Sequence, residues 1–158
     1  MYKIVSPLKI RLSIDRKGKE RFFILNLNNY RNTYFRTLNV AKIKYKQAIV
    51  DQIQDKPRYE KIAILYKVFK GDNRRFDIGN VLSIHQKFFE DALTECGKIP
   101  DDKSSILPLV VQMNGEVNID NPRVDIYIFN LLDKKDRLDL EHKLNEVLNN
   151  WYTYFYFY

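Results

Sequence analysis

Residues 60–97, EKIAILYKVFKGDNRRFDIGNVLSIHQKFFEDALTECG, decide the fold, because the clearest strand and the clearest helix of the chain follow each other there. β-Branched and aromatic residues dominate positions 60–70, which is typical of a central strand. From about Ile78 to Cys96 the apolar residues recur with a helical period, and Gly97 follows as a C-cap residue. A strand that leads directly into such a helix favours a domain in which helices cover a sheet.

The N-terminal third predicts a hairpin followed by a helix. Residues 8–14 alternate apolar and polar side chains, residues 15–19 read as a turn, and residues 20–27 form the return strand. An asparagine-rich stretch marks the exit from the hairpin, and a helical period then runs from about Thr33 until Pro57 closes it. The expected apolar stripe of this helix is Tyr34, Leu38, Ala41, Tyr45, Ala48 and Ile53.

The C-terminal third adds two strands and a last helix. Residues 105–113 and 123–129 have the composition of strands, and Asp133 or Asp136 is placed to cap a helix after them. The aromatic tail, residues 151–158, alternates with the period of a strand. We expect the tail to pack in the core or across a dimer interface, with stacking on unpaired bases as the alternative.

Together these elements predict one α/β (α+β) domain over residues 1–158, with a small mixed sheet flanked by about three helices. Apolar residues make up 45% and charged residues 30% of the chain, a profile that excludes disorder. The apolar runs are too short to span a membrane. Because Cys96 is alone, we expect neither a disulfide framework nor a cysteine zinc site, and a reducing cytoplasm as the compartment.

The charge of the chain favours a polyanionic partner. The 27 basic residues outnumber the 20 acidic ones, for a formal net charge of +7, and nucleic acid is the commonest partner of such proteins. The sequence contains no glycine-rich phosphate-binding loop, the motif that would indicate a small-molecule substrate instead. For the lysines on a helix the alternative is an ordinary solvated face. The candidate phosphate contacts are Arg31, Arg36, Lys42, Lys44, Lys46, Arg74 and Arg75.

Carboxylates stand at both ends of the predicted helix 78–96. Asp77 and Asn80 occupy its start, and the pair Asp101-Asp102 follows its end. Taken singly, Asp77 reads as a helix cap and Asp101-Asp102 as a turn. As a set on a basic chain, they are able to hold a divalent metal against a phosphate backbone. We expect His85 to be exposed or packed rather than to act as a general base.

These residues resemble the RusA family of Holliday-junction resolvases, especially the RusA-like proteins of bacteriophages. In that family a strand leads into Asp-x-Asp-Asn, then a helix with Lys and Asp-Ala-Leu, then Gly and a closing Asp-Asp. The resemblance covers about residues 8–130. The matching positions are Asp77-Ile78-Gly79-Asn80, Lys87, Asp91-Ala92-Leu93, Gly97 and Asp101-Asp102.

The chain departs from the family pattern in two places. Gly79 stands where the family has its second acid, and four extra residues separate Asn80 from Asp91. The position of the family lysine is Ser83 when counted from Asn80 and Lys87 when counted back from Asp91; we favour Lys87. Asp91 lies about 20 Å along the helix axis from the start of the helix, too far to share one ion with an acid there.

The resemblance implies a Mg²⁺-dependent endonuclease that hydrolyses branched DNA, from a phage or prophage, with Mn²⁺ as a substitute metal. It implies Asp77, Asp101 and Asp102 as metal ligands, and Lys87 as a catalytic side chain on the phosphate. The alternative for Lys87 is a salt bridge to Asp91. Two matched cuts in a four-way junction imply a homodimer. Two other functions stay open: a protein that binds branched DNA without cutting, which Gly79 favours, and an interaction protein whose acids are only caps.

Overall fold

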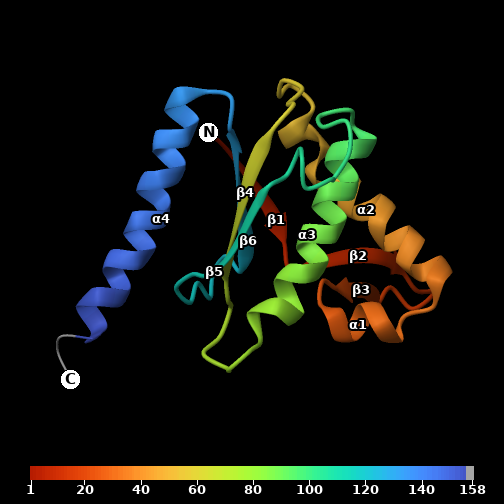
Figure 1. Ribbon diagram of the computed structural model, residues 1–158. Helices are drawn as coiled ribbons and strands as arrows, with labels where there is room; N and C mark the ends of the chain where they lie inside the picture. The colour runs from red at the N-terminus through yellow and green to blue at the C-terminus, as the bar shows by residue number, and fades with distance from the viewer. Residues whose placement is uncertain (156–158) are drawn as a thin grey trace.

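The computed structural model describes the backbone of residues 1–155 and the side chains of residues 1–149. Its central layer is a mixed sheet with the order β1–β6–β4–β5 (Figure 1). Strands β1 (Tyr2–Pro7), β6 (Arg123–Asn130) and β4 (Ile62–Phe69) are antiparallel neighbours, and β5 (Leu109–Asn114) runs parallel to β4 at the edge. The predicted mixed sheet is thereby confirmed.

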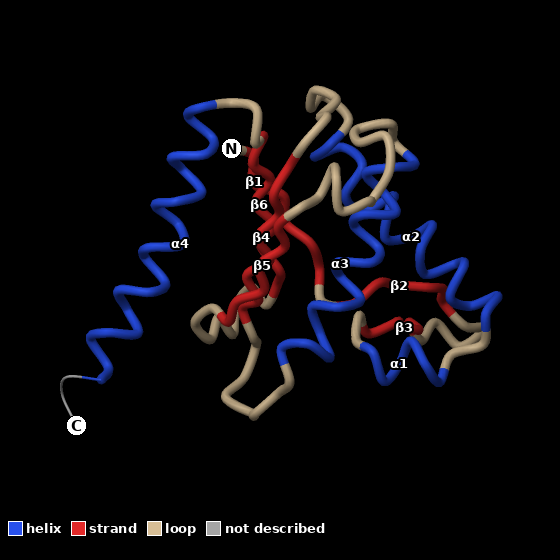
Figure 2. Tube along the Cα trace, in the orientation of Figure 1, coloured by secondary structure: helices blue, strands red, loops and turns tan. Residues whose placement is uncertain are grey.

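Strand β4 is apolar almost throughout because both faces of the sheet are covered. Helices α2 (Phe35–Ile53) and α3 (Ile78–Glu95) lie on one face, and α4 (Lys134–Phe155) lies on the other (Figure 2). Successive β4 side chains therefore enter two different cores. Ile62, Ile64, Tyr66 and Val68 pack toward α2 and α3, whereas Ala63 and Leu65 pack in the α4 core.

The predicted hairpin forms a second, two-stranded sheet beside α2. Strands β2 (Lys9–Ile14) and β3 (Glu20–Ile24) pair around a turn in which Gly18 has φ +78°, a conformation that favours glycine. The asparagine-rich stretch was expected to be only the exit from this hairpin. It instead forms the short helix α1 (Leu27–Asn32), because the Asn26 side chain accepts a hydrogen bond of 2.8 Å from the Asn29 amide.

Helix α3 begins and ends where its local sequence predicts. Asp77 is its N-cap residue. At the other end Gly97 has φ +67°, and the Lys98 and Gly97 amides donate to the carbonyls of Leu93 and Thr94 at 2.8 and 2.9 Å. This pair of bonds satisfies two of the final carbonyls and lets the chain leave the helix.

The structure differs from the sequence-based expectations at β1, at the apolar stripe of α2 and in the aromatic tail. Strand β1 was not expected; it forms because Ile4 and Ser6 are buried against the α2–α3 core while its backbone completes the edge of β6. On α2, Ile49 is buried in place of the expected Ala48, because it is Ile49 that faces the core. Tyr34 was expected in the same apolar stripe, but it precedes α2 as the N-cap residue and is exposed.

The aromatic tail is also different from the expectation. Helix α4 continues to Phe155, so residues 151–155 are helical and not a strand. A helix has a period of 3.6 residues, and the alternation in the sequence therefore does not sort the tail into two faces. The backbone of residues 156–158 and the side chains of the whole tail lie outside the described residues, and so do its expected packing and stacking. No helix in the described part of the chain is long and apolar enough to cross a membrane.

Candidate nucleic-acid interface

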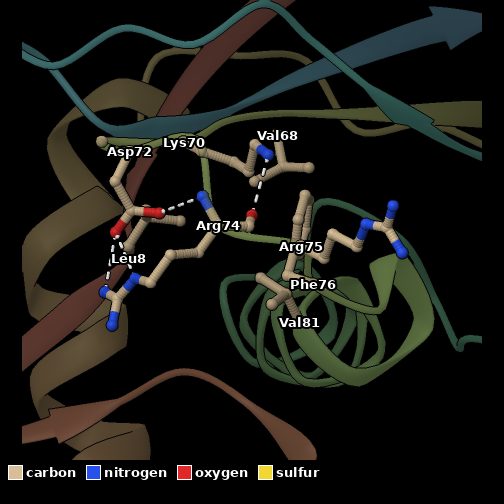
Figure 3. A pocket seen from close by; sticks show the side chains of 9 residues that line it. Leu8, Val68, Lys70, Asp72, Arg74, Arg75, Phe76 and Val81 are labelled. Carbon is tan, nitrogen blue, oxygen red and sulfur yellow. Dashed lines mark hydrogen bonds and ion pairs between the residues drawn. The ribbon is translucent and has the colours of Figure 1, made fainter.

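Basic side chains line a hollow where β4 leads into α3. The hollow has a volume of about 320 Å³, and its walls include Lys70, Asp72, Arg74, Arg75 and Val81 (Figure 3). Strand β4 and the start of α3 position this loop, because the chain must turn between them at one end of the sheet. The predicted contacts Arg74 and Arg75 therefore border one concave surface.

The two arginines differ in how they are held. Asp72 accepts two hydrogen bonds, of 2.9 and 2.7 Å, from the Arg74 guanidinium, and these bonds lower the pKa of the Asp72 carboxyl. The Arg75 guanidinium points away from this pair (Figure 3). Within the described part of the chain no carboxylate pairs with Arg75. Arg75 is therefore the side chain of the two that is available to a bound phosphate.

Two further hollows adjoin the hairpin. One, of about 310 Å³, lies between β2, β3 and the start of α2, and the other, of about 340 Å³, lies between β2 and the middle of α2. All three hollows are lined in part by residues of the segment 7–13. Among the described residues that line them, one is acidic, Asp72. The basic residues that line them are Lys9, Arg11, Arg21, Arg36, Lys44, Lys70, Arg74 and Arg75.

The predicted acid at the start of α3 has a structural role. The exposed Asp77 carboxylate accepts a hydrogen bond of 3.3 Å from the Asn80 amide and so caps the helix. The Asn80 side chain accepts from the Asn28 amide at 3.2 Å, which ties α1 to α3. A β-carbon at Gly79 would lie 3.3 Å from Asp77 Oδ1, so an acid at this position would stand next to Asp77.

The acids after α3 lie in a different environment. Asp101 forms an ion pair of 2.7 Å with Lys103 and accepts a hydrogen bond from the Asp102 amide, and both contacts lower the pKa of Asp101. The charge of Asp102 acts on Glu90, a residue that the sequence patterns did not single out. Burial raises the pKa of Glu90 to about 7, and Asp102 adds to this increase.

Glu90 belongs to a polar seam between α3 and the sheet. It is 8% exposed, and its Oε1 atom has no hydrogen-bond partner in the described structure. Gln86, one turn earlier on α3, accepts a hydrogen bond of 3.0 Å from Gln112 on β5. The charge of Glu90 in turn raises the pKa of Tyr66, after the larger effect of burial. On a helical wheel of α3, Glu90 lies next to Leu93 at the edge of the apolar face, and this position is the sequence signal for a partly apolar environment of the acid.

The three predicted metal ligands do not lie close together within a single chain. Figure 1 shows the loops before and after α3 at opposite ends of the helix. Asp77 caps the start of α3. Asp102 lies near Glu90, because its charge raises the pKa of Glu90, and Glu90 is about 20 Å from the start of α3 by rise per residue. Among residues 1–149 no group of three or more His, Cys, Asp or Glu side chains is placed to hold a metal ion. The described residues of a single chain thus do not fit a three-carboxylate Mg²⁺ site.

The predicted lysines mostly serve contacts between helices. Lys42 on α2 forms an ion pair of 2.8 Å with Asp91, and Lys46 pairs with Glu95 one turn further along α3. Lys87 is exposed and lies 4.0 Å from Asp91, which is the salt bridge that was its alternative. These ion pairs hold α2 against α3, and they place Lys42 and Lys46 beside acids.

Of the remaining residues considered from the sequence, His85 lies in the core, and Arg31 and Arg36 lie on the surface. His85 is fully buried, and its Nδ1 atom lies 3.0 Å from the Ser6 hydroxyl, which donates a hydrogen bond to the Tyr45 hydroxyl; Nδ1 is therefore the donor to Ser6. Burial lowers the pKa of His85 to about 3, so the side chain is a packed neutral histidine. Arg31, in the last turn of α1, is exposed. Arg36 lies near the exposed ring of Phe35, with 5.8 Å between its guanidinium carbon and the ring centroid.

In comparisons with known proteins, no family model matches the chain and no curated protein matches it at a significant level. The resemblance to the RusA family therefore stands on the motif residues themselves.

Proposed function

We propose that this chain acts on branched DNA, as a structure-specific, metal-dependent endonuclease of the kind that the RusA resemblance implies. One observation carries the DNA-binding part. Among the described residues, the three hollows beside segment 7–13 are lined by eight basic residues and one acid, Asp72; two of the eight, Arg11 and Arg74, form ion pairs with Glu20 and Asp72. Such a concentration of cations attracts the phosphate backbone and makes affinity depend on salt.

Cleavage is supported by the motif and by the exposed carboxylates of Asp77 and Asp102. A single chain does not bring these carboxylates together, because they belong to opposite ends of α3. A homodimer is part of the proposal, since two matched cuts need two copies of the site. Mg²⁺ is the proposed metal, with Mn²⁺ as its substitute.

A second candidate function is the binding of branched DNA without cutting. Two observations favour it. Asp77 is engaged as the cap of α3, and Gly79 leaves the neighbouring position without a carboxylate. The basic hollows serve this function equally well, so the two candidates differ only in whether the phosphodiester bond is broken.

The test is incubation of the protein with a labelled four-way junction and with a linear duplex of the same sequence, in Mg²⁺ and in Mn²⁺. Asp77→Asn and Asp102→Asn are the site variants, and Asp120→Asn, an exposed acid in the loop before β6, is the matched control. Paired nicks that disappear in both site variants and persist in the control support the endonuclease. Tight junction binding without nicks supports the second candidate, and equal weak binding to both DNAs contradicts both.

A further inference from the structure

Two aromatic side chains at the start of α2 are exposed. Tyr34 is 60% and Phe35 is 58% exposed, and their ring centroids lie 4.6 Å apart with an interplanar angle of 59°. Neither ring packs in a core cluster of the described residues. Because burial of an aromatic ring stabilises a fold strongly, two neighbouring rings in solvent indicate a surface that binds something.

The surroundings of the two rings are cationic. Arg36 lies over the Phe35 ring at 5.8 Å, and Arg36 also lines the hollow of about 310 Å³ together with Arg21 of β3. The first turn of α2 contains no acid. Together, Tyr34, Phe35, Arg36 and Arg21 form a surface that we call the aromatic–arginine patch.

The chemistry of this patch matches an unpaired nucleotide. Every nucleobase has a π-face that stacks on Tyr or Phe, and the adjoining phosphate is a partner for a guanidinium group. A base within a duplex is covered by its neighbours, so the rings reach only bases that have left the stack. A second copy of this chain is a poorer occupant. A two-fold contact through the patch brings the cationic surfaces of both copies together, which is unfavourable.

We propose that the aromatic–arginine patch binds unpaired nucleotides of branched DNA, with Tyr34 and Phe35 stacking on bases and Arg36 and Arg21 holding the neighbouring phosphates. The inference rests on the proposed action on branched DNA and deepens it. The basic hollows supply affinity for any DNA, and the patch supplies the preference for a branch or a single strand.

The experiment measures the affinity of the full chain for a four-way junction, a single strand and a linear duplex. The test variant is Tyr34→Ala with Phe35→Ala, and the rescue variant is Tyr34→Phe with Phe35→Tyr, which keeps both rings. The matched control is Ile43→Ala, an apolar residue that is 53% exposed on the same helix. Since each stacked base contributes roughly a five-fold or larger change in affinity, the double alanine variant loses about 10-fold or more on the junction and single strand. Its duplex affinity changes less than two-fold.

A photoreactive 5-iodouracil at the branch point gives a direct readout, since it crosslinks to a stacked aromatic side chain, and the linked peptide contains Tyr34 or Phe35. Equal losses on all three DNAs, or crosslinks only elsewhere, overturn the inference. So does a double alanine variant that turns a dimer into a monomer in sedimentation, because the patch is then a self-interface. If Arg75→Gln weakens binding while the double alanine variant does not, the proposed DNA function stands and only this inference falls. A wild-type chain that binds none of the DNAs overturns both.

Discussion

The two ends of α3 use charged residues in opposite ways. At its start, Asp77 is exposed and Arg75 has no acidic partner in the described structure. In its last turns, Asp91 and Glu95 are paired with lysines of α2, and Glu90 is buried. Exposed, unpaired charge can meet a ligand, whereas paired or buried charge acts on the stability of the fold. The comparison supports the proposal that DNA binds at the start of α3 and around the hairpin, whereas the charged residues in the last turns of α3 stabilise the fold.

The largest effect that tests this comparison is the pH dependence of stability from Glu90. Its pKa is about 7 in the folded chain against 4.5 for the free side chain. The folded state therefore holds this proton more tightly, so the stabilisation is present in full below pH 4.5 and is lost as the pH rises to 7. Relative to Glu90→Gln, which resembles the protonated acid, the wild type should lose up to about 3 kcal/mol between these limits.

Urea denaturation of both proteins from pH 4.5 to pH 8 measures this difference. The difference between the two proteins removes the contribution of His85, which acts in the opposite sense. Its pKa is lowered to about 3, so the stabilisation from neutral His85 is present above pH 6.5 and is lost as the pH falls. Glu141→Gln, at an exposed acid on α4, is the control and should give no such slope. A Glu90→Gln effect that is constant with pH would contradict the buried, protonated acid.

The next largest effect distinguishes the role of Asp77 as the cap of α3 from the role of its negative charge. Asp77→Ala removes the acceptor for the Asn80 amide and should lower the free energy of unfolding by about 1 kcal/mol. Asp77→Asn keeps an acceptor at the same place and should change the stability by only a few tenths of a kcal/mol. Thermal and urea unfolding of the two variants measure this. Loss of junction cleavage in the asparagine variant, with stability retained, then reports the carboxylate charge rather than the fold.

Two charge variants test whether the paired lysine stabilises the fold and the unpaired arginine binds DNA. Lys42→Gln removes the partner of the half-buried Asp91 and should destabilise the chain by about 0.5–1 kcal/mol, with little effect on DNA affinity. Arg75→Gln should leave the stability unchanged and weaken binding to every DNA, with a smaller salt dependence. Chemical denaturation and a salt titration of binding measure both. An exchange of these two phenotypes would place the DNA surface at the α2–α3 contact.

The smallest expected effect comes from Gly79→Asp. The added β-carbon lies 3.3 Å from Asp77 Oδ1, so the new carboxylate stands beside the existing one at the positive end of the helix dipole. Replacement of glycine in a helix and an acid in its first turn favour the helix, whereas the tight contact with Asp77 and the repulsion between two neighbouring carboxylates oppose it, so the net change in stability should be no more than a few tenths of a kcal/mol. Calorimetric titration with Mn²⁺ tests the second consequence, tighter binding of a divalent ion. Gly79→Asn, which adds a side chain without the charge, is the control, and equal Mn²⁺ affinities for both variants would show that the position does not support metal binding.

The elements that sequence patterns predicted correctly have local causes. The apolar run of β4, the Asp77 cap and the Gly97 end of α3, and the Gly18 turn of the hairpin are all specified by residues close to each other in the chain. The elements that were missed have non-local causes. Strand β1 exists because β6, more than one hundred residues later, offers it an edge. The aromatic tail has a strand-like alternation, yet its first residues continue α4.

By itself, the sequence determined the α/β class, the basic character of the chain and the identity of the residues available for chemistry. Only the tertiary structure decided how those residues are used. It paired Lys42 with Asp91, buried Glu90 and left Tyr34 and Phe35 in solvent. The physical reason is that capping and periodicity act over a few residues, whereas burial and ion pairing depend on which distant surface the fold brings near.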